Sequence, residues 1–127
     1  MGEWAGHNAE RAIAKLEQFL ASATESEIEQ AGVVQAFEFS FEACWKFFQR
    51  LALTEGLSAA TPRSALGAAL KMGIINDEAL WLAMLEARNL TSHIYNEALA
   101  ATIYANVRSR FGPALIAAIA TAKRRQP

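Results

Sequence analysis

The sequence predicts an all-α protein, an antiparallel up-and-down four-helix bundle with additional short helices. Apolar residues recur at helical spacing along most of the chain, strand-like alternation is missing, and short segments rich in helix-capping residues separate the periodic stretches. The chain has 127 residues, 53% of them hydrophobic and 20% charged, which is typical of one globular domain with a single core. We therefore expect one helical-bundle domain over residues 1–127.

Two helices are expected in the first half of the chain. Asn8 is the expected cap of a helix that runs to about Ala21, and a longer helix follows from about Glu27 to Thr54. Gly56 is well suited to end that helix in a left-handed conformation. Its heaviest apolar face should form the core and consists of Val34, Phe37, Phe41, Cys44, Trp45, Phe48 and Leu51. Stacking of bases on these aromatic rings is the less favoured interpretation.

The second half contains signals for three main helices and a final one. Thr61 caps a third helix with Pro62 at its first position, and Gly73 closes it. The stretch 76–97 is predicted to be the organising helix, with Asn76 and Asp77 as caps. A fifth helix should run from Glu97 to Phe111 behind an Asn96 cap, after which 112–113 (Gly-Pro) interrupts and an alanine-rich helix follows.

The organising helix is apolar on two faces. One narrow stripe is predicted to pack on the core and consists of Leu80, Ala83, Ala87, Leu90 and Ile94. The second face carries an apolar patch that polar residues continue, and consists of Trp81, Leu82, Leu85, Arg88, Asn89, Ser92 and His93. Because a helix that is apolar on both faces is usually buried on both, we expect a second copy of the chain to cover this face.

The polar cluster has the residues needed for metal-independent RNA cleavage. Asn89 and His93 are four residues apart, so the amide can orient the imidazole ring, and Tyr95 aligns with Arg88 if the helix extends that far. A histidine takes the 2′-hydroxyl proton and an arginine stabilises the charged phosphorane. One histidine is short of an acid–base pair, which two chains about a two-fold axis would supply. A surface arginine beside a satisfied histidine is the simpler interpretation.

The segment RNLTSHIY has the Arg-x-x-x-x-His-x-Tyr pattern of HEPN domains. Together with FEFSFEACWKFFQRL, TPRSALGAALKMGII and WLAMLEARNLTSHIYNE, it resembles the nucleotidyltransferase substrate-binding branch of that group, over about Phe37 to Tyr104. This resemblance implies a helical homodimer encoded beside a minimal nucleotidyltransferase. In the toxin–antitoxin members the helical protein is a metal-independent ribonuclease, whose catalytic residues match Arg88 and His93. Asn89 after the arginine is also typical of the group.

The resemblance also implies how such a ribonuclease is regulated. The tyrosine that matches Tyr95 is the acceptor of nucleotide groups that the partner enzyme adds, which silences the toxin. The branch was named for a substrate-binding role, so a non-catalytic subunit that forms a complex with the nucleotidyltransferase is the second hypothesis. A groove or partner contact would then involve Glu38, Glu42, Lys46, Trp81 and Ser92. The simpler interpretation of the Glu38, Glu42 and Lys46 face is a solvated surface.

Charge, cysteine content and the length of apolar runs argue against several other classes of protein. A net charge of −1 argues against gripping long nucleic acid by bulk electrostatics, although a local site for RNA remains open. Cys44, the single cysteine, cannot form an internal disulfide and is expected in the core. No apolar run reaches the length of a membrane span and no secretion signal is evident, so we expect a cytoplasmic protein. His7 and His93 are far apart, and neither a metal nor a cofactor is expected.

Overall fold

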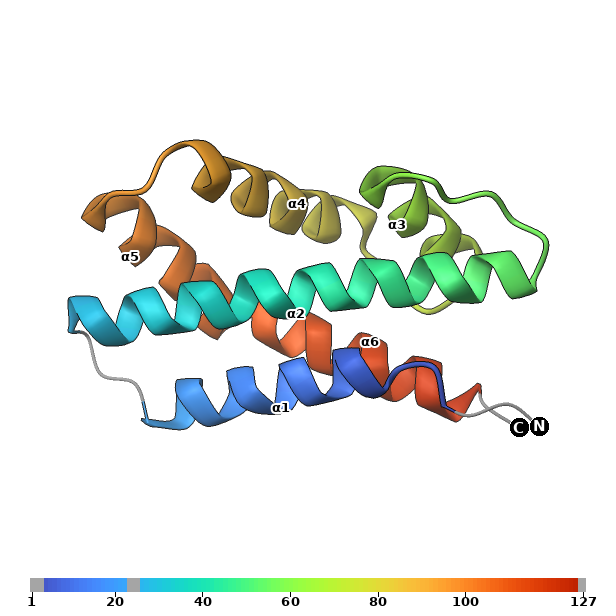
Figure 1. Ribbon diagram of the computed structural model, residues 1–127, viewed down its shortest axis with the longest axis horizontal. Helices are drawn as coiled ribbons and strands as arrows, with labels where there is room; N and C mark the ends of the chain where they lie inside the picture. The colour runs from blue at the N-terminus through green and yellow to red at the C-terminus, as the bar shows by residue number, and fades with distance from the viewer. Residues whose placement is uncertain (1–3, 23–25, 126–127) are drawn as a thin grey trace.

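The computed structural model describes residues 4–22 and 26–125, and within them the chain is all-α, without strands (Figure 1). Six α-helices and one π-helical turn follow one another: α1 (His7–Ser22), α2 (Glu27–Thr54), α3 (Pro62–Lys71), α4 (Glu78–His93), α5 (Glu97–Asn106), η1 (Val107–Phe111) and α6 (Gly112–Arg124). The long elements form the expected bundle, with α3 as an additional short helix. No helix in the described ranges is long and apolar enough to cross a membrane.

The helix α2 is the centre of the molecule. It contacts every other helix and crosses the middle of Figure 1, with α1 on one side and α3 and α4 on the other. The predicted core positions Phe37, Phe41, Cys44 and Phe48 are all fully buried. Phe37 stacks on Phe111 of η1 with ring centroids 5.4 Å apart, so aromatic packing joins the two halves of the chain.

Most helix ends lie where the capping residues indicate. Asp77 and Asn96 each accept a hydrogen bond from the backbone N–H three residues later, and Thr61 forms a reciprocal capping box with Ser64. Gly56 and Gly73 both have a φ of +75°, the left-handed conformation that ends α2 and α3. Asn8 differs from its expected role, because α1 already begins at His7.

The predicted interruption at 112–113 is wrong, because α5 and α6 are joined by the π-helical turn η1 rather than by a break. The Gly112 N–H donates to the Val107 carbonyl five residues earlier. In a regular α-helix the Pro113 ring would clash with the carbonyl four residues before it, and the wider turn relieves this clash. The chain therefore stays helical from Glu97 to Arg124.

The predicted orientation of α4 is also wrong. Leu90 and Ile94 of the expected core stripe are 42% and 55% exposed, whereas Trp81 is only 2% exposed. The Trp81 ring packs against Phe41 and Phe48, with centroids 6.3 and 5.5 Å away. Trp81, Met84 and Leu85 bury more apolar area than a leucine–alanine stripe, so α4 turns this face inward. Trp81 is consequently a core residue and not the groove or partner contact that was expected.

Candidate functional site

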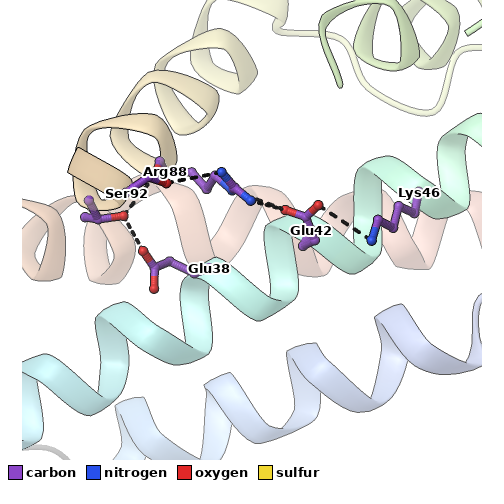
Figure 2. A network of polar contacts seen from close by, with 6 residues as sticks. Glu38, Glu42, Lys46, Arg88 and Ser92 are labelled. Atoms are coloured by element: carbon purple, nitrogen blue, oxygen red, sulfur yellow. Dashed lines mark hydrogen bonds and ion pairs between the residues drawn. The ribbon is translucent and has the colours of Figure 1, made fainter. Parts of the chain in front are cut away.

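Arg88 lies at the contact between α4 and α2, where Glu42 holds its guanidinium group (Figure 2). Its Nε and Nη2 atoms donate to Glu42 Oε1 at 3.1 and 2.8 Å, and Nη1 donates to Ser92 Oγ at 3.3 Å. Lys46 Nζ lies 3.7 Å from the other Glu42 oxygen. Because the Arg88 side chain is still 35% exposed, its charge is partly compensated yet reachable from solvent.

A second contact from α2 fixes the same turn of α4. Thr91 donates a hydrogen bond to Glu38 and lies within hydrogen-bond distance of the Arg88 carbonyl. Glu38, Glu42, Lys46, Arg88 and Ser92 are therefore brought together, with Thr91, as one polar network. Glu38, Glu42, Lys46 and Ser92 are among the residues expected at a groove or partner contact, and that role stays a prediction. Thr91 was not predicted, although its place within the motif was a usable signal.

His93 and Asn89 face a different neighbour. They line an open groove of about 600 Å³ between α3 and α4, which consists of Arg63, Ala79, Leu82, Ala83, Leu85, Glu86, Asn89, Leu90 and His93. The His93 side chain is exposed, and no hydrogen-bond partner is assigned to it within the described ranges. The imidazole is therefore accessible to a group bound in the groove.

Arg63 is the groove residue that sequence reasoning missed. It occupies the first turn of α3, where the positive end of the helix dipole disfavours a cation. An exposed arginine at such a position is a signal for a role other than helix stability, because it costs rather than contributes stability there. The polar side chains of the groove are consequently one arginine, one glutamate, one amide and one imidazole.

Tyr95 lies outside α4, because the helix ends at His93 and Ile94 is extended. The conditional alignment of Arg88 with Tyr95 on one helix therefore does not occur. Tyr95 is 53% exposed and lines a separate groove of about 430 Å³ between the start of α2 and the start of α5. In this groove a hydrogen bond and charge repulsion from Glu97 raise the pKa of Glu27, so the surroundings of Tyr95 are acidic.

The other candidates take structural roles. Cys44 is buried among apolar side chains, and burial raises the pKa of its thiol, so the reactive thiolate is disfavoured. Within 4–22 and 26–125 no three His, Cys, Asp or Glu side chains are grouped so that they could hold a metal ion.

Comparisons with known proteins identify the family of this chain. Residues 6–123 match the family described as nucleotidyltransferase substrate binding protein like. A probable ribonuclease HepT of Haemophilus influenzae is 34% identical over 82 residues, which are 61% of this chain and 56% of that protein. The aligned part thus spans little more than half of that relative.

A solved structure shares the fold. A crystal structure of a protein from Thermus thermophilus superimposes with a TM-score of 0.79 and is 33% identical, and the match covers 88% of this chain and 96% of that one. The family match covers nearly the whole chain, and the motif residues Arg88 and His93 lie on α4, whereas Tyr95 follows its end. The chain therefore belongs to the nucleotidyltransferase substrate-binding protein family, the branch of the HEPN domains that its sequence resembles.

Proposed function

We propose that this chain is a cytoplasmic, metal-independent ribonuclease that acts as a homodimer and is paired with a minimal nucleotidyltransferase in a toxin–antitoxin type of system. The observation that carries the proposal is the placement of Arg88 and His93 at the accessible end of α4. The first is a half-buried guanidinium that can exchange its carboxylate partner for a phosphate, and the second is an exposed imidazole in an open groove. The name of the Haemophilus relative supports the same chemistry.

The reaction is a transesterification in which His93 acts as the base. His93 takes the proton of the 2′-hydroxyl, the 2′-oxygen forms a bond to phosphorus, and the bond from phosphorus to the 5′-oxygen breaks. Arg88 stabilises the negative charge of the phosphorane, and a second histidine returns a proton to the leaving 5′-oxygen. We infer that Asn89, which lines the same groove as His93, orients the imidazole ring when RNA is bound. The products are a cyclic phosphate end and a free 5′-hydroxyl.

The second histidine is the reason for proposing a homodimer. Within one chain Arg88 turns toward α2 and His93 toward α3, so a single protomer does not gather a complete acid–base pair with its cation. Leu90 and Ile94 leave apolar surface exposed beside His93, which a second chain can cover. A two-fold axis at this face would place two histidines around one phosphate.

Incubation of the purified protein with mixed RNA in EDTA tests the ribonuclease. We expect the parent protein to cleave and to leave cyclic phosphate ends, and His93→Ala to be at least about a hundredfold slower because it lacks the base. Intact-mass measurement must first show that Tyr95 is unmodified. Equal cleavage by parent and variant would refute the assignment of His93.

We further propose that nucleotide transfer to Tyr95 regulates the enzyme. Tyr95 is 53% exposed, whereas Tyr104, the other tyrosine, is buried and its hydroxyl accepts hydrogen bonds from Arg108 at 2.8 and 3.1 Å. Incubation with the partner nucleotidyltransferase and nucleoside triphosphates should therefore add nucleotide mass to the parent protein and to Tyr104→Phe. Tyr95→Phe should gain none, and an adduct on that variant would place the acceptor elsewhere.

The second candidate function is a non-catalytic subunit that binds a substrate for the nucleotidyltransferase. The observation in its favour is that Glu42 already engages Arg88, while the neighbouring open groove presents Arg63, Glu86, Asn89 and His93 to a ligand. Co-purification of the two proteins, without RNA cleavage by an unmodified sample, would support this role. Nucleotide transfer that proceeds equally well without this chain would count against it.

A further inference from the structure

The face between α1 and α2 carries an exposed aromatic ring among cations. Phe39 is 63% exposed and belongs to two adjoining grooves, of about 430 and 380 Å³, that meet at Phe39 and Asn8. Arg11 and Lys15 of α1 line the first groove, and Lys46 and Arg50 of α2 line the second. We call these five side chains, Arg11, Lys15, Phe39, Lys46 and Arg50, the basic strip.

The charges of the basic strip are mostly uncompensated. No ion pair or hydrogen bond is assigned to the side chains of Arg11, Lys15 or Arg50 within residues 4–22 and 26–125. The single carboxylate in the two grooves is Glu42, which Arg88 and Lys46 already share. A chain with a net charge of −1 thus collects positive charge on one side, where a polyanion gains most from binding.

We propose that the basic strip binds single-stranded RNA on its way to the reactive phosphate, an inference that rests on the proposed ribonuclease function. Proteins that hold single strands without strict sequence preference combine aromatic rings, on which bases stack, with flanking cations that contact phosphates. Phe39 supplies the ring. Two pairs of cations, Arg11 with Lys15 in one groove and Lys46 with Arg50 in the other, supply the phosphate contacts. Each pair is spaced four residues apart on its helix, so its members share one face.

Continuity with the proposed catalytic residues favours RNA over an acidic protein. Lys46 Nζ lies 3.7 Å from one Glu42 oxygen, and Arg88 Nη2 lies 2.8 Å from the other. Glu42, which holds Arg88, follows Phe39 by three residues, about 4.5 Å of helix rise, and Lys46 follows it by seven, about 10 Å. A strand whose base stacks on Phe39 therefore comes close to Arg88 at the level of Glu42 and continues along α2 toward Lys46. A second copy of this chain is disfavoured as the occupant, because a two-fold axis here would bring like charges together.

Binding of an uncleavable oligonucleotide tests the proposal separately from cleavage. A fluorescein-labelled 2′-O-methyl oligouridine of about 12 nucleotides lacks the attacking hydroxyl, and anisotropy measures its dissociation constant at several salt concentrations. We expect Arg11→Gln/Lys15→Gln to bind less tightly, with a slope of log affinity against log salt that is shallower by about 1.4, or 0.7 per phosphate contact. Lys71→Gln/Arg124→Gln removes the same charge from exposed positions outside the strip and should bind like the parent.

Stacking on Phe39 is tested by two substitutions of one ring. Phe39→Leu keeps an apolar side chain but loses the aromatic face, so its affinity should fall about tenfold, whereas Phe39→Trp should retain the affinity of the parent. Equal binding by parent, Phe39→Leu and the Arg11/Lys15 double variant would overturn the proposal, as would equal losses in the control double variant. A shift of Phe39→Leu from dimer to monomer in sizing would overturn it too, because the face would then be an interface between copies.

The cleavage assay separates this proposal from the ribonuclease itself. If His93-dependent cleavage is found and the strip variants bind normally, the ribonuclease proposal is supported and the proposal that the basic strip binds RNA is refuted. If the strip variants lose affinity as expected while the unmodified parent cleaves nothing, the RNA-binding face stands and the ribonuclease is refuted. A parent protein that fails to bind the oligonucleotide at all refutes the basic strip directly.

Discussion

At the scale of single residues, the central feature is that Arg88 forms an ion pair with Glu42 and still remains partly exposed to solvent. Its partner Glu42 is 29% exposed and also attracts Lys46, so one carboxylate divides its charge between two cations. A half-exposed ion pair of this kind contributes little to stability, in general about 1 kcal/mol or less. Glu42 thus serves mainly to orient the guanidinium that the proposed chemistry needs and to compensate part of its positive charge.

Glu42→Gln tests whether this carboxylate competes with RNA for Arg88. The amide keeps the size of the side chain and one acceptor oxygen but removes the negative charge. We expect affinity for the uncleavable oligonucleotide to rise about threefold and the salt slope to steepen by about 0.7, as one more phosphate contact becomes available. Anisotropy measures both quantities, and thermal unfolding should change little.

The matched control for this experiment is Glu17→Gln, which removes one exposed carboxylate from α1. If both variants gain the same affinity, the effect is general electrostatics and not release of Arg88. If Glu42→Gln binds RNA more weakly than the parent, Glu42 is a positioning residue that Arg88 requires.

At the scale of whole helices, the features that depend on local signals could be predicted from the sequence, whereas those that depend on tertiary packing could not. The caps Thr61, Asp77 and Asn96 were predictable because each acts on backbone groups within its own first turn. The face of α4 was not, because a helix with two apolar faces has no local reason to bury one of them. The choice depends on Trp81 finding Phe41 and Phe48 on another helix.

The candidate site was likewise only partly predictable from the sequence. The motif residues Arg88 and His93 were identified from spacing and resemblance, and their five-residue spacing already places them about 140° apart around α4. That Arg88 faces α2 and His93 faces α3 depends on the orientation of the helix, which the sequence did not predict. Arg63 comes from a different helix, so only the fold brings it to the groove of His93. Tyr95 left the helix because the chain becomes extended at Ile94, one residue after the motif histidine.

The π-helical turn η1 leaves no room for a side chain at Gly112, which a substitution can test. A Cβ atom at this position would lie 2.7 Å from the Val107 carbonyl oxygen and 3.4 Å from Leu20 Cδ1. Because the closer atom belongs to the backbone and cannot move cheaply, Gly112→Ala should lower the free energy of unfolding by about 1 kcal/mol or more, despite the better helix propensity of alanine. Denaturant unfolding with two-state analysis measures this change.

Gly67→Ala provides the matched control within α3. A Cβ atom there meets nothing within 4 Å, so the substitution should stabilise the protein by up to about 1 kcal/mol through helix propensity. If Gly112→Ala stabilises to the same extent, the strain at Val107 is absent and the turn readily adopts regular α-helix.

At the scale of the whole molecule, structural and uncompensated cations lie on different parts of the fold. Near the end of α6, Lys123 pairs with Glu10 of α1 at 2.8 Å, and Arg125 reaches Glu55 and the Met72 carbonyl. The hydrogen bond from Lys123, followed by that from Trp4, lowers the pKa of Glu10. The basic residues at the end of α6 thus fasten helix ends, whereas Lys46 is the single basic-strip cation with an ion pair to a carboxylate in the part of the chain that the structure describes.

The proposed two-histidine site makes a quantitative prediction about mixed dimers. When parent and His93→Ala chains pair at random in equal amounts, about one dimer in four contains two parent chains and about half contain one. If each site needs a base and an acid from different chains, activity should fall to about one quarter of that of the same total amount of parent. Chains that act independently would keep about one half.

Co-expression of the two chains with different affinity tags permits this measurement on isolated heterodimers as well. We expect the heterodimer to cleave far more slowly than half the parent rate, because its single histidine serves as base or as acid but not both. Native mass spectrometry confirms the composition, and a His7→Ala heterodimer, altered at an exposed histidine far from the motif, should retain full activity. A heterodimer with half the parent activity would mean that each α4 carries a complete site and that the second copy supplies burial, not chemistry.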